Sequence, residues 1–418
     1  MVDEGNRNAR ETAEAVARRS YGKLVAFLAA QTGDVARAED ALSEAFAAAL
    51  SHWPQTGVPE NPEAWLMAVA RRKIIDMVRR RKNSDAAFDH LKLMADEMEH
   101  GAKSATEIPD DRLALMFACA HPAIDAAIRA PLILQTLLGF DAATIASAFL
   151  VSPAAMDQRL SRAKNKIREA GIAFRIPERA DLPERLDAVL AAIYAAFAKG
   201  WSDSAGTEID RGNLAVEAIW LGRLVASLLP DEPEALGLLS LMLHSDSRRA
   251  ARRGPHGEYV PLAEQNPNLW DPMSIEEAEA LLFQAARMHT PGRYQLEAAV
   301  QSAHAARRLT GRSDWQAIEK IYDALTVLCP SPVVLVNRAV AIAEIRGAEA
   351  GLEALSQLAD DERLHDYQPF WAARAALLAR IGKTNAADEA YERAIGLERD
   401  PAVRAFLQQR RSALTHRH

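Results

Sequence analysis

The chain has 418 residues, with 50 lysines and arginines against 57 aspartates and glutamates and a formal net charge of −7. Apolar residues make up 49% of it, and this length and composition predict a folded protein of roughly two to four domains. No stretch of about 18 apolar residues predicts a membrane span, and the charged N-terminus lacks the apolar segment of a signal peptide. Two cysteines, Cys119 and Cys329, argue against a disulfide framework and favour a reducing cytoplasmic location.

The charge is unevenly distributed along the chain. Residues 1–175 hold 23 lysines and arginines and 23 aspartates and glutamates, whereas residues 176–418 hold 27 and 34, so the net negative charge belongs to the C-terminal part. Within the first part, the bases gather in ARRKIIDMVRRRK and RLSRAKNKIR. Clustered cations of this kind indicate a polyanionic partner.

Apolar residues recur three and four apart through almost every segment, which predicts an all-α protein. The first clear break is HWPQTGVPENPEAW, whose prolines predict a loop from Pro54 to Asn61. Asn61 and Pro62 then suit the start of a new helix, because asparagine caps a helix and proline tolerates its first turn. A polar stretch over residues 82–109 is predicted to be a linker.

Two basic helices stand on either side of this linker. The first, NPEAWLMAVARRKIIDMVRRRK, carries seven cations and one acid between Arg71 and Lys82, with Trp65 and Ile74 on its apolar side. The second follows an Ala-rich helix over residues 142–149 and a short turn, which is the spacing of a helix-turn-helix. Two such helices joined by a linker predict two contacts along one nucleic acid.

The second basic helix begins at Ser152 and Pro153, and its apolar residues are expected to face the core. Glutamine and arginine near the start of such a helix can read base edges, while later lysines and arginines hold phosphates. The alternative is a solvated helix face with no partner. The side chains predicted to lie outside are Asp157, Gln158, Arg159, Ser161, Arg162 and Lys166.

The C-terminal part begins after FRIPERADLP, over residues 174–183, and contains the long loop RRAARRGPHGEYVPLAEQNPNLWDP. From about residue 300, small and aromatic residues recur with a period of about 34, as in Trp315 and Tyr322 and again in Gly382 and Tyr391. This period is typical of tetratricopeptide repeats, which stack helix pairs into a solenoid. An ordinary helical bundle of the same composition is the alternative.

The order of AEDALSEAFAAAL, a loop, AWLMAVARRKIIDMVRRR, a linker and LVSPAAMDQRLSRAKNKIREAG resembles the extracytoplasmic-function sigma factors of bacterial RNA polymerase. The resemblance implies sigma region 2 over residues 10–84, a linker over 85–109, and a region 4 helix-turn-helix over 110–175. Residues 180–418 resemble the tetratricopeptide-like extension of one subgroup. It implies RNA polymerase core (β′ clamp helices and β flap) and promoter DNA as partners, with no cofactor and no enzymatic activity.

The resemblance also implies roles for particular residues. Those matching the surface that docks on the polymerase clamp helices are Asp40, Glu44 and Phe46. Those matching the loop and basic helix that bind the promoter −10 element, by a pocket for a flipped base and by phosphate contacts, are Pro54, Gln55, Thr56, Gly57, Asn61, Arg71, Arg72, Arg79 and Arg80. Those matching the −35 reader are Gln158, Arg159, Arg162 and Lys166.

The sequence departs from the family pattern in two places. Asp157 stands where family members often carry a basic or polar residue, which leaves the −35 preference open. In the extension, Ala198-Lys199-Gly200-Trp201 replaces a segment that reads Asn-Glu-Gly-Tyr in the family, which leaves the role of that segment open.

Signals for other chemistry are weak. Cys119 and His121 have no second pair at metal-ligand spacing, so a buried thiol beside a helix end is the better interpretation and no metal site is predicted. No phosphate-binding glycine motif is present. The basic cluster from Arg248 to Arg253 is either a solvated loop or a partner for acids of another domain.

These observations favour a sigma factor that brings polymerase core to specific promoters and helps to open them, with the acidic C-terminal part as a regulator or as a surface for a regulatory protein or small ligand. A stand-alone helix-turn-helix regulator with a repeat-based sensor is one alternative. A repeat scaffold with incidental basic helices is another. The acidic helix around Asp40 and Glu44, one loop before the basic helix, favours the sigma factor.

Overall fold

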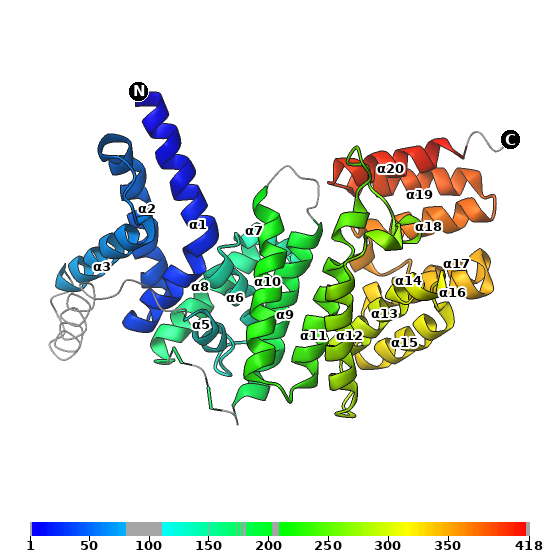
Figure 1. Cartoon of the computed structure of the whole chain (residues 1–418), viewed down its shortest axis with the longest axis horizontal. Helices are drawn as coiled ribbons and strands as arrows, with labels where there is room; N and C mark the ends of the chain where they lie inside the picture. Colours follow the sequence, from blue (N-terminus) through cyan, green and yellow to red (C-terminus); the bar gives the residue numbers. More distant parts are fainter. Residues whose placement is uncertain are drawn as a thin grey trace. The chain divides into compact units, whose positions relative to one another are not determined.

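The computed structural model of the chain describes residues 2–80, 111–149, 151–172, 174–175, 177–178, 181–202 and 209–414. Within these residues the protein is built from α-helices and short 3-10 helices with no β-strand, which confirms the predicted all-α fold (Figure 1). The chain divides into two compact units, Met1–Ala196 and Phe197–His418. The predicted linker over residues 85–109 lies outside the described residues.

The N-terminal unit contains three long helices followed by shorter ones. They are α1 (Val2–Thr32), α2 (Val35–Thr56), α3 (Pro62–Arg80), α5 (Arg112–Cys119), α6 (Ala126–Leu138), α7 (Ala142–Ala148), α8 (Pro153–Glu169) and α9 (Leu182–Ser202). The first three pack on one another, α5 and α6 pack on α1, and α8 contacts α2, α6 and α7. The division between the two units falls inside α9.

Side-chain caps fix where these helices begin. The Asp34 carboxylate accepts a hydrogen bond from the Arg37 amide (3.1 Å) at the start of α2, and the Asn61 side chain accepts one from the Ala64 amide (3.1 Å) at the start of α3. Ser152 does the same for Ala155 (3.4 Å) at the start of α8, where Pro153 is the first helical residue. The predicted cap at Asn61 and the predicted helix start at Ser152 and Pro153 are therefore confirmed.

The loop before α3 is shorter than the sequence predicted. α2 continues through Pro54 to Thr56, and the chain leaves the helix at Gly57, whose φ of 84° is accessible to glycine. Pro54 is tolerated because it lies in the last turn, where its missing amide costs only one hydrogen bond. The Gly57 amide closes the helix on the Trp53 carbonyl (2.9 Å).

Helices α1 and α6 approach so closely that only glycine fits between them. The Leu137 carbonyl oxygen lies 2.0 Å from the point where a Cβ on Gly22 would stand. Tyr21, the residue before Gly22, packs on Gly139. Gly139 ends α6 in the left-handed conformation, with a φ of 66°. The segments predicted as regions 2 and 4 therefore share a packed interface within the N-terminal unit.

The C-terminal unit continues as a chain of antiparallel helices, each packed on the next. Its α-helices are α10 (Ile209–Leu228), α11 (Pro233–Asp246), α12 (Pro272–Ala286), α13 (Arg293–Ala305), α14 (Arg307–Thr310), α15 (Trp315–Leu328), α16 (Pro332–Arg346), α17 (Ala348–Ser356), α18 (Gln368–Arg380), α19 (Thr384–Leu397) and α20 (Pro401–Ser412). Its 3-10 helices are η1 (Arg249–Arg252), η2 (Leu262–Glu264), η3 (Pro267–Leu269) and η4 (Glu362–Leu364). The predicted long loop is the segment between α11 and α12, which carries the first three 3-10 helices.

The predicted repeat region forms the helix pairs α15–α16, α17–α18 and α19–α20. Residues of the periodic pattern lie in its cores, among them Ile318, Leu355 and Tyr391. Gly382 stands between two helices with a φ of 75°. The helix pairs agree with a repeat architecture, and the assignment to the tetratricopeptide class stays a prediction.

Candidate polymerase and nucleic-acid interface

Helix α8 separates its residues into two faces, as its sequence predicted. Met156, Leu160, Ala163 and Ile167 are buried, and Ala155 is half-buried. Because these positions recur three and four apart, the opposite face must be polar. The side chains exposed there are Asp157, Gln158, Arg159, Ser161, Arg162 and Lys166.

The four predicted −35 residues therefore all project from the same side of α8. In the described part of the chain, none of Arg159, Arg162 and Lys166 has a carboxylate partner, and Arg162 only donates to the Gln158 carbonyl of its own helix (3.3 Å). Three cations without counter-ions on one exposed face attract a polyanion. The arrangement suits phosphate and base contacts.

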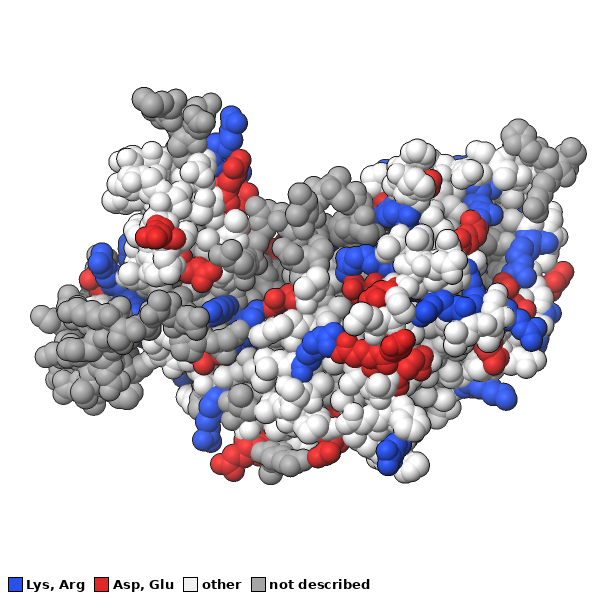
Figure 2. All heavy atoms as spheres, in the orientation of Figure 1, with Lys and Arg blue, Asp and Glu red and all other residues white. Residues whose placement is uncertain are grey.

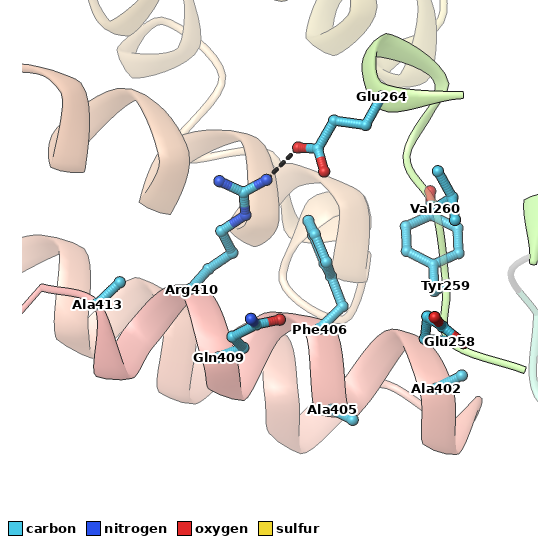
Figure 3. Close-up of a pocket in the computed structure, with 10 residues that line it drawn as sticks. All are labelled: Glu258, Tyr259, Val260, Glu264, Ala402, Ala405, Phe406, Gln409, Arg410 and Ala413. Carbon is cyan, nitrogen blue, oxygen red and sulfur yellow. Dashed lines mark hydrogen bonds and ion pairs between the residues drawn. The ribbon is translucent and has the colours of Figure 1, made fainter. Parts of the chain in front are cut away.

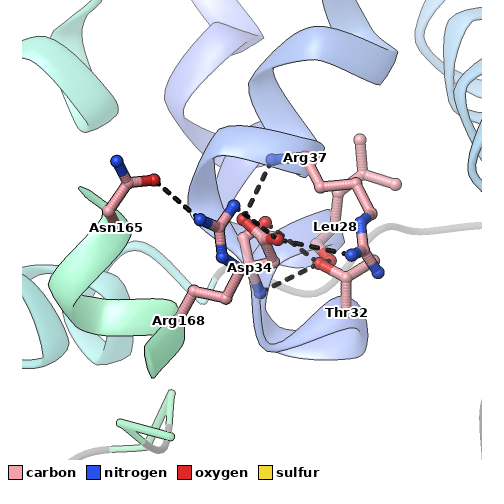
Figure 4. Close-up of polar contacts among 6 residues, drawn as sticks. All are labelled: Leu28, Thr32, Asp34, Arg37, Asn165 and Arg168. Carbon is pink, nitrogen blue, oxygen red and sulfur yellow. Dashed lines mark hydrogen bonds and ion pairs between the residues drawn. The ribbon is translucent and has the colours of Figure 1, made fainter. Parts of the chain in front are cut away.

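Two further cations of α8 point the other way, toward α2. Lys164 Nζ lies 2.5 Å from Glu39 Oε2, and both side chains are almost fully buried. Arg168 reaches the buried Asp34 carboxylate at 3.9 Å and donates to the Asn165 side chain at 2.8 Å (Figure 4). Burial raises the pKa of Glu39, and the neighbouring Lys164 ammonium partly offsets that rise.

The predicted polymerase-docking residues lie along α2. Asp40 and Glu44 are four residues apart, on one exposed side of the helix, and Phe46 is half-buried. Glu44 forms an exposed ion pair with Lys73 of α3 (2.8 Å). The acidic helix and the basic helix of the sequence are thus direct neighbours.

The predicted −10 residues divide between an exposed turn and α3. Of the segment before α3, Pro54 is half-buried, and Gln55, Thr56, Gly57 and Asn61 are exposed. Arg72 is exposed, whereas Arg71 is half-buried with its guanidinium 5.2 Å from the centre of the Phe27 ring. Burial lowers the pKa of Arg71. The side chains of Arg79 and Arg80 lie outside the described part of the structure.

Two tryptophans, Trp53 of α2 and Trp65 of α3, pack against each other in this region. Trp53 is buried and meets Trp65 edge to face, with 5.5 Å between ring centres. Ile74 is buried as predicted, but Trp65 is only half-buried, so Trp53 is the tryptophan that fills the core. The aromatic pair fixes the end of α2 against α3.

Sequence reasoning missed the contact between α8 and α2. The four partners are Asp34, Glu39, Lys164 and Arg168. The only signal in the sequence was that the two bases, four residues apart, lie on one face of α8. Such patterns are common on solvated helices, and the acidic and basic pairs lie more than 120 residues apart in the chain.

Metal and thiol chemistry find little support in the structure. Among the described residues, no group of three or more histidine, cysteine, aspartate or glutamate side chains could hold a metal ion. Cys119 ends α5, is fully buried and lies 3.5 Å from Thr136 Oγ1, and burial raises the pKa of its thiol to about 12. His121 accepts a hydrogen bond from the Ala123 amide (3.1 Å).

The C-terminal unit shows no single charged face in the view of Figure 2, where acidic and basic side chains are interspersed. It contains a groove of about 530 Å³ between the loop residues 258–264 and α20. Tyr259 and Phe406 meet in this groove edge to face, with 5.5 Å between ring centres, and Arg410 pairs with Glu264 across it (Figure 3). No helix of the described chain is long and apolar enough to span a membrane.

Comparison with known proteins gives two family matches and one relative. Residues 16–84 match the family described as Sigma-70 region 2, and residues 185–286 match a family of unknown function (DUF6596). An uncharacterized protein, R00370, of Rhizobium meliloti (strain 1021) is 40% identical over 375 residues, which are 88% of each chain. No solved structure matches the chain.

The region 2 match covers α2, α3 and the turn between them, where the predicted docking and −10 residues lie. The Sigma-70 region 2 match supports a role in transcription initiation. The chain belongs to one family with the rhizobial relative, and its N-terminal residues 16–84 match Sigma-70 region 2. RNA polymerase core and promoter DNA are the partners that region 2 implies.

Proposed function

We propose that the protein is an extracytoplasmic-function sigma factor in which α2 docks on polymerase core, the turn before α3 captures a −10 base, and α8 reads the −35 element. The observation that carries the proposal is the exposed face of α8. Gln158 and Arg159, near the start of the helix, suit base contacts, and Arg162 follows them on the same face. The helix comes after a domain that matches region 2 in the chain.

The electrostatics of the two predicted contacts are complementary to their partners. On α2, Asp40 and Glu44 present carboxylates, which suit a docking surface on another protein. On α8, three cations without counter-ions suit DNA phosphates. Separate weak contacts of this kind give little affinity for duplex DNA in the free protein and make it sensitive to salt.

We further propose that the C-terminal unit regulates these contacts. It accounts for more than half of the chain, and its described part offers stacked helix pairs and a groove rather than a basic face. Repeat architectures of this kind bind partners on extended surfaces. The proposal assigns regulation to this unit and leaves its sign to experiment.

Run-off transcription from a promoter library, with polymerase core in the presence and absence of the full-length protein, tests the proposal. Promoter-specific transcripts are expected only with the protein, and Arg159→Ala is expected to reduce them by roughly 5- to 150-fold, since one good base contact contributes about 1–3 kcal/mol. Arg338→Ala, which removes an arginine paired with Asp323 in the C-terminal unit, is the matched control. Operator binding by the protein alone, with no response of core polymerase, would identify a stand-alone regulator instead.

A further inference from the structure

The turn after α11 places four arginines within six residues, from Arg248 to Arg253. Two of them have carboxylate partners in their own unit. Arg249 pairs with Asp246 (2.5 Å), and Arg253 pairs with Asp400 at the start of α20. The cluster is therefore only partly neutralised, and it is not a freely solvated loop.

The other two arginines, Arg248 and Arg252, hydrogen-bond only to neutral groups. Arg248 donates to the Gln301 side chain (2.5 Å) and weakly to the His244 carbonyl (3.4 Å), and Arg252 donates to the Trp201 carbonyl (2.5 Å). Within the described residues, no carboxylate lies at ion-pair distance from either guanidinium. Burial lowers the pKa of Arg252. The Asp400 carboxylate offsets this effect only in part, and it is already engaged by Arg253.

The surroundings of these two guanidiniums make their charge costly. Burial lowers the pKa of Arg248 to about 10, and the neighbouring Arg252 adds to that effect. His244 and His304 beside them are neutral, because burial and Arg248 lower the pKa of each to about 4. His244 is fully buried, and neither of its ring nitrogens has a hydrogen-bond partner. Two adjacent cations in such a polar but uncompensated site are stabilised by an anion.

The two guanidiniums are also held in place and remain accessible. Arg252 stacks on the Trp201 ring at 4.1 Å, Arg249 lies 5.7 Å from the same ring, and Phe197 stacks on Trp201 at 6.0 Å with an interplanar angle of 13°. Arg248 Nη1 and the Nε and Nη2 of Arg252 make no hydrogen bond within the described chain. Arg248 and Arg252 are both half-buried, so part of each residue is exposed to solvent. A fixed guanidinium with free donors matches the fork geometry that binds phosphate or carboxylate.

We propose that Arg248 and Arg252 form a binding site for an oxyanion, the phosphate or carboxylate group of a small molecule. Trp201 orients Arg252 in this site, and Gln301 orients Arg248. Through this site the C-terminal unit binds a small-molecule ligand directly. It does not depend on polymerase or promoter binding, so a failure of the sigma-factor proposal leaves it intact.

Isothermal titration calorimetry of the full-length protein with inorganic phosphate, and separately with citrate, tests the site at constant ionic strength set by chloride. At least one of the two anions is expected to bind saturably with one site per chain, and the stronger one identifies the preferred oxyanion. Arg252→Gln is expected to weaken that binding at least tenfold. Arg338→Gln, in the same unit but already paired with Asp323, is expected to bind as the wild type does.

Thermal unfolding separates ligand binding from a purely structural role of Arg252. The anion that binds is expected to raise the unfolding temperature of the wild type and of Arg338→Gln, because it binds the folded state. Arg252→Gln is expected to lose that rise, whatever its unfolding temperature in chloride alone. Saturable binding that is unchanged in Arg252→Gln, or no saturable binding of either anion at millimolar concentration, would overturn the proposal. An equal anion-dependent rise in wild type and Arg252→Gln would do the same.

Discussion

The ammonium of Lys164 on α8 lies 2.5 Å from the carboxylate of Glu39 on α2, and the two side chains are only 15% and 13% exposed. The pair joins the helix predicted to read the −35 element to the helix predicted to dock on polymerase. Arg168 of α8 adds a second contact to this interface, with the buried Asp34 carboxylate at the start of α2. The free protein thus holds its predicted −35 helix against its predicted polymerase-docking helix.

Removal of the Lys164 ammonium is expected to leave the Glu39 carboxylate buried without a partner. Lys164→Met should lower the free energy of unfolding by about 3 kcal/mol, and the double variant Lys164→Met/Glu39→Leu should recover most of that loss. The penalty should be smaller at pH 5 than at pH 8, because the raised pKa of Glu39 makes its carboxyl easier to protonate, and a protonated carboxyl carries no buried charge.

Urea unfolding of the wild type, the single variants Lys164→Met and Glu39→Leu and the double variant, at pH 8 and pH 5, measures these free energies. Additive single-variant effects of less than about 0.5 kcal/mol would mean that the pair contributes nothing beyond an exposed ion pair.

If α3 and α8 bind the −10 and −35 elements as proposed, the interface between α8 and α2 must open on DNA. The names of the −10 and −35 elements place them about 25 base pairs apart, or ~85 Å at 3.4 Å per base pair, whereas the ion pair holds α8 in direct contact with α2. Glu39→Gln removes the attraction and leaves the cations of α8 in place. It is therefore expected to raise the affinity of polymerase holoenzyme for promoters that carry both elements, by roughly 3- to 10-fold if the pair contributes about 1 kcal/mol.

Filter binding with three duplexes, carrying both elements, the −35 element alone or neither, measures this effect. Glu11→Gln, at an exposed position of α1, is the control. An equal gain on all three duplexes would point to a general change of charge and not to opening of the interface.

The sequence predicted correctly those features that depend on a single helix, such as which side chains are buried and where the helix begins. The periodicity of α8 predicted which side chains are buried and which are exposed, because burial within one helix follows its 3.6-residue period. The caps at Asn61 and Ser152 were equally local. The end of α2 was misjudged, because a proline in the last turn of a helix resembles a helix breaker.

Contacts between distant segments could not be predicted in the same way. Nothing in the basic run distinguishes Lys164, which meets Glu39, from Lys166, which faces solvent, until α8 is placed on α2. In the same manner, Arg249 and Arg253 form ion pairs with carboxylates. Arg248 and Arg252 form none within the described residues. These outcomes depend on packing between elements far apart in sequence.

Gly22 is expected to be a position where any side chain disrupts the N-terminal unit. Its Cβ would stand 2.0 Å from the Leu137 carbonyl oxygen, so Gly22→Ala must push α1 and α6 apart. We expect a loss of at least about 2 kcal/mol in unfolding free energy, the scale of overpacking in a tight contact. Gly396→Ala is the matched control, because nothing lies within 4 Å of its Cβ position inside α19.

The control variant should gain about 0.5–1 kcal/mol, since alanine is the better helix former. Denaturant unfolding measures both changes. A neutral Gly22→Ala would mean that the α1–α6 contact relaxes at no cost and that the interface between the two segments is loose.

The buried histidines of the C-terminal unit make its stability depend on acid. The folded-state pKa of His244 is lowered from 6.5 to about 4 by burial and by Arg248, and that of His304 is lowered to about 4 by burial, Arg248 and Arg307. A group whose folded pKa lies below its unfolded pKa stabilises the fold above the unfolded value, and this contribution is lost as the pH falls from 6.5 toward 4. For the fully buried His244 the loss is at most roughly 3 kcal/mol, and it is smaller for the half-buried His304. The Glu279 carboxylate, 3.5 Å from His244 Nε2, is too exposed to offset this loss fully.

Urea unfolding between pH 7 and pH 4.5 should therefore show a shallower loss of stability in His244→Gln than in the wild type. The control His256→Gln, in an exposed part of the loop, should follow the wild type. Parallel losses in all three proteins would place the acid sensitivity elsewhere in the chain.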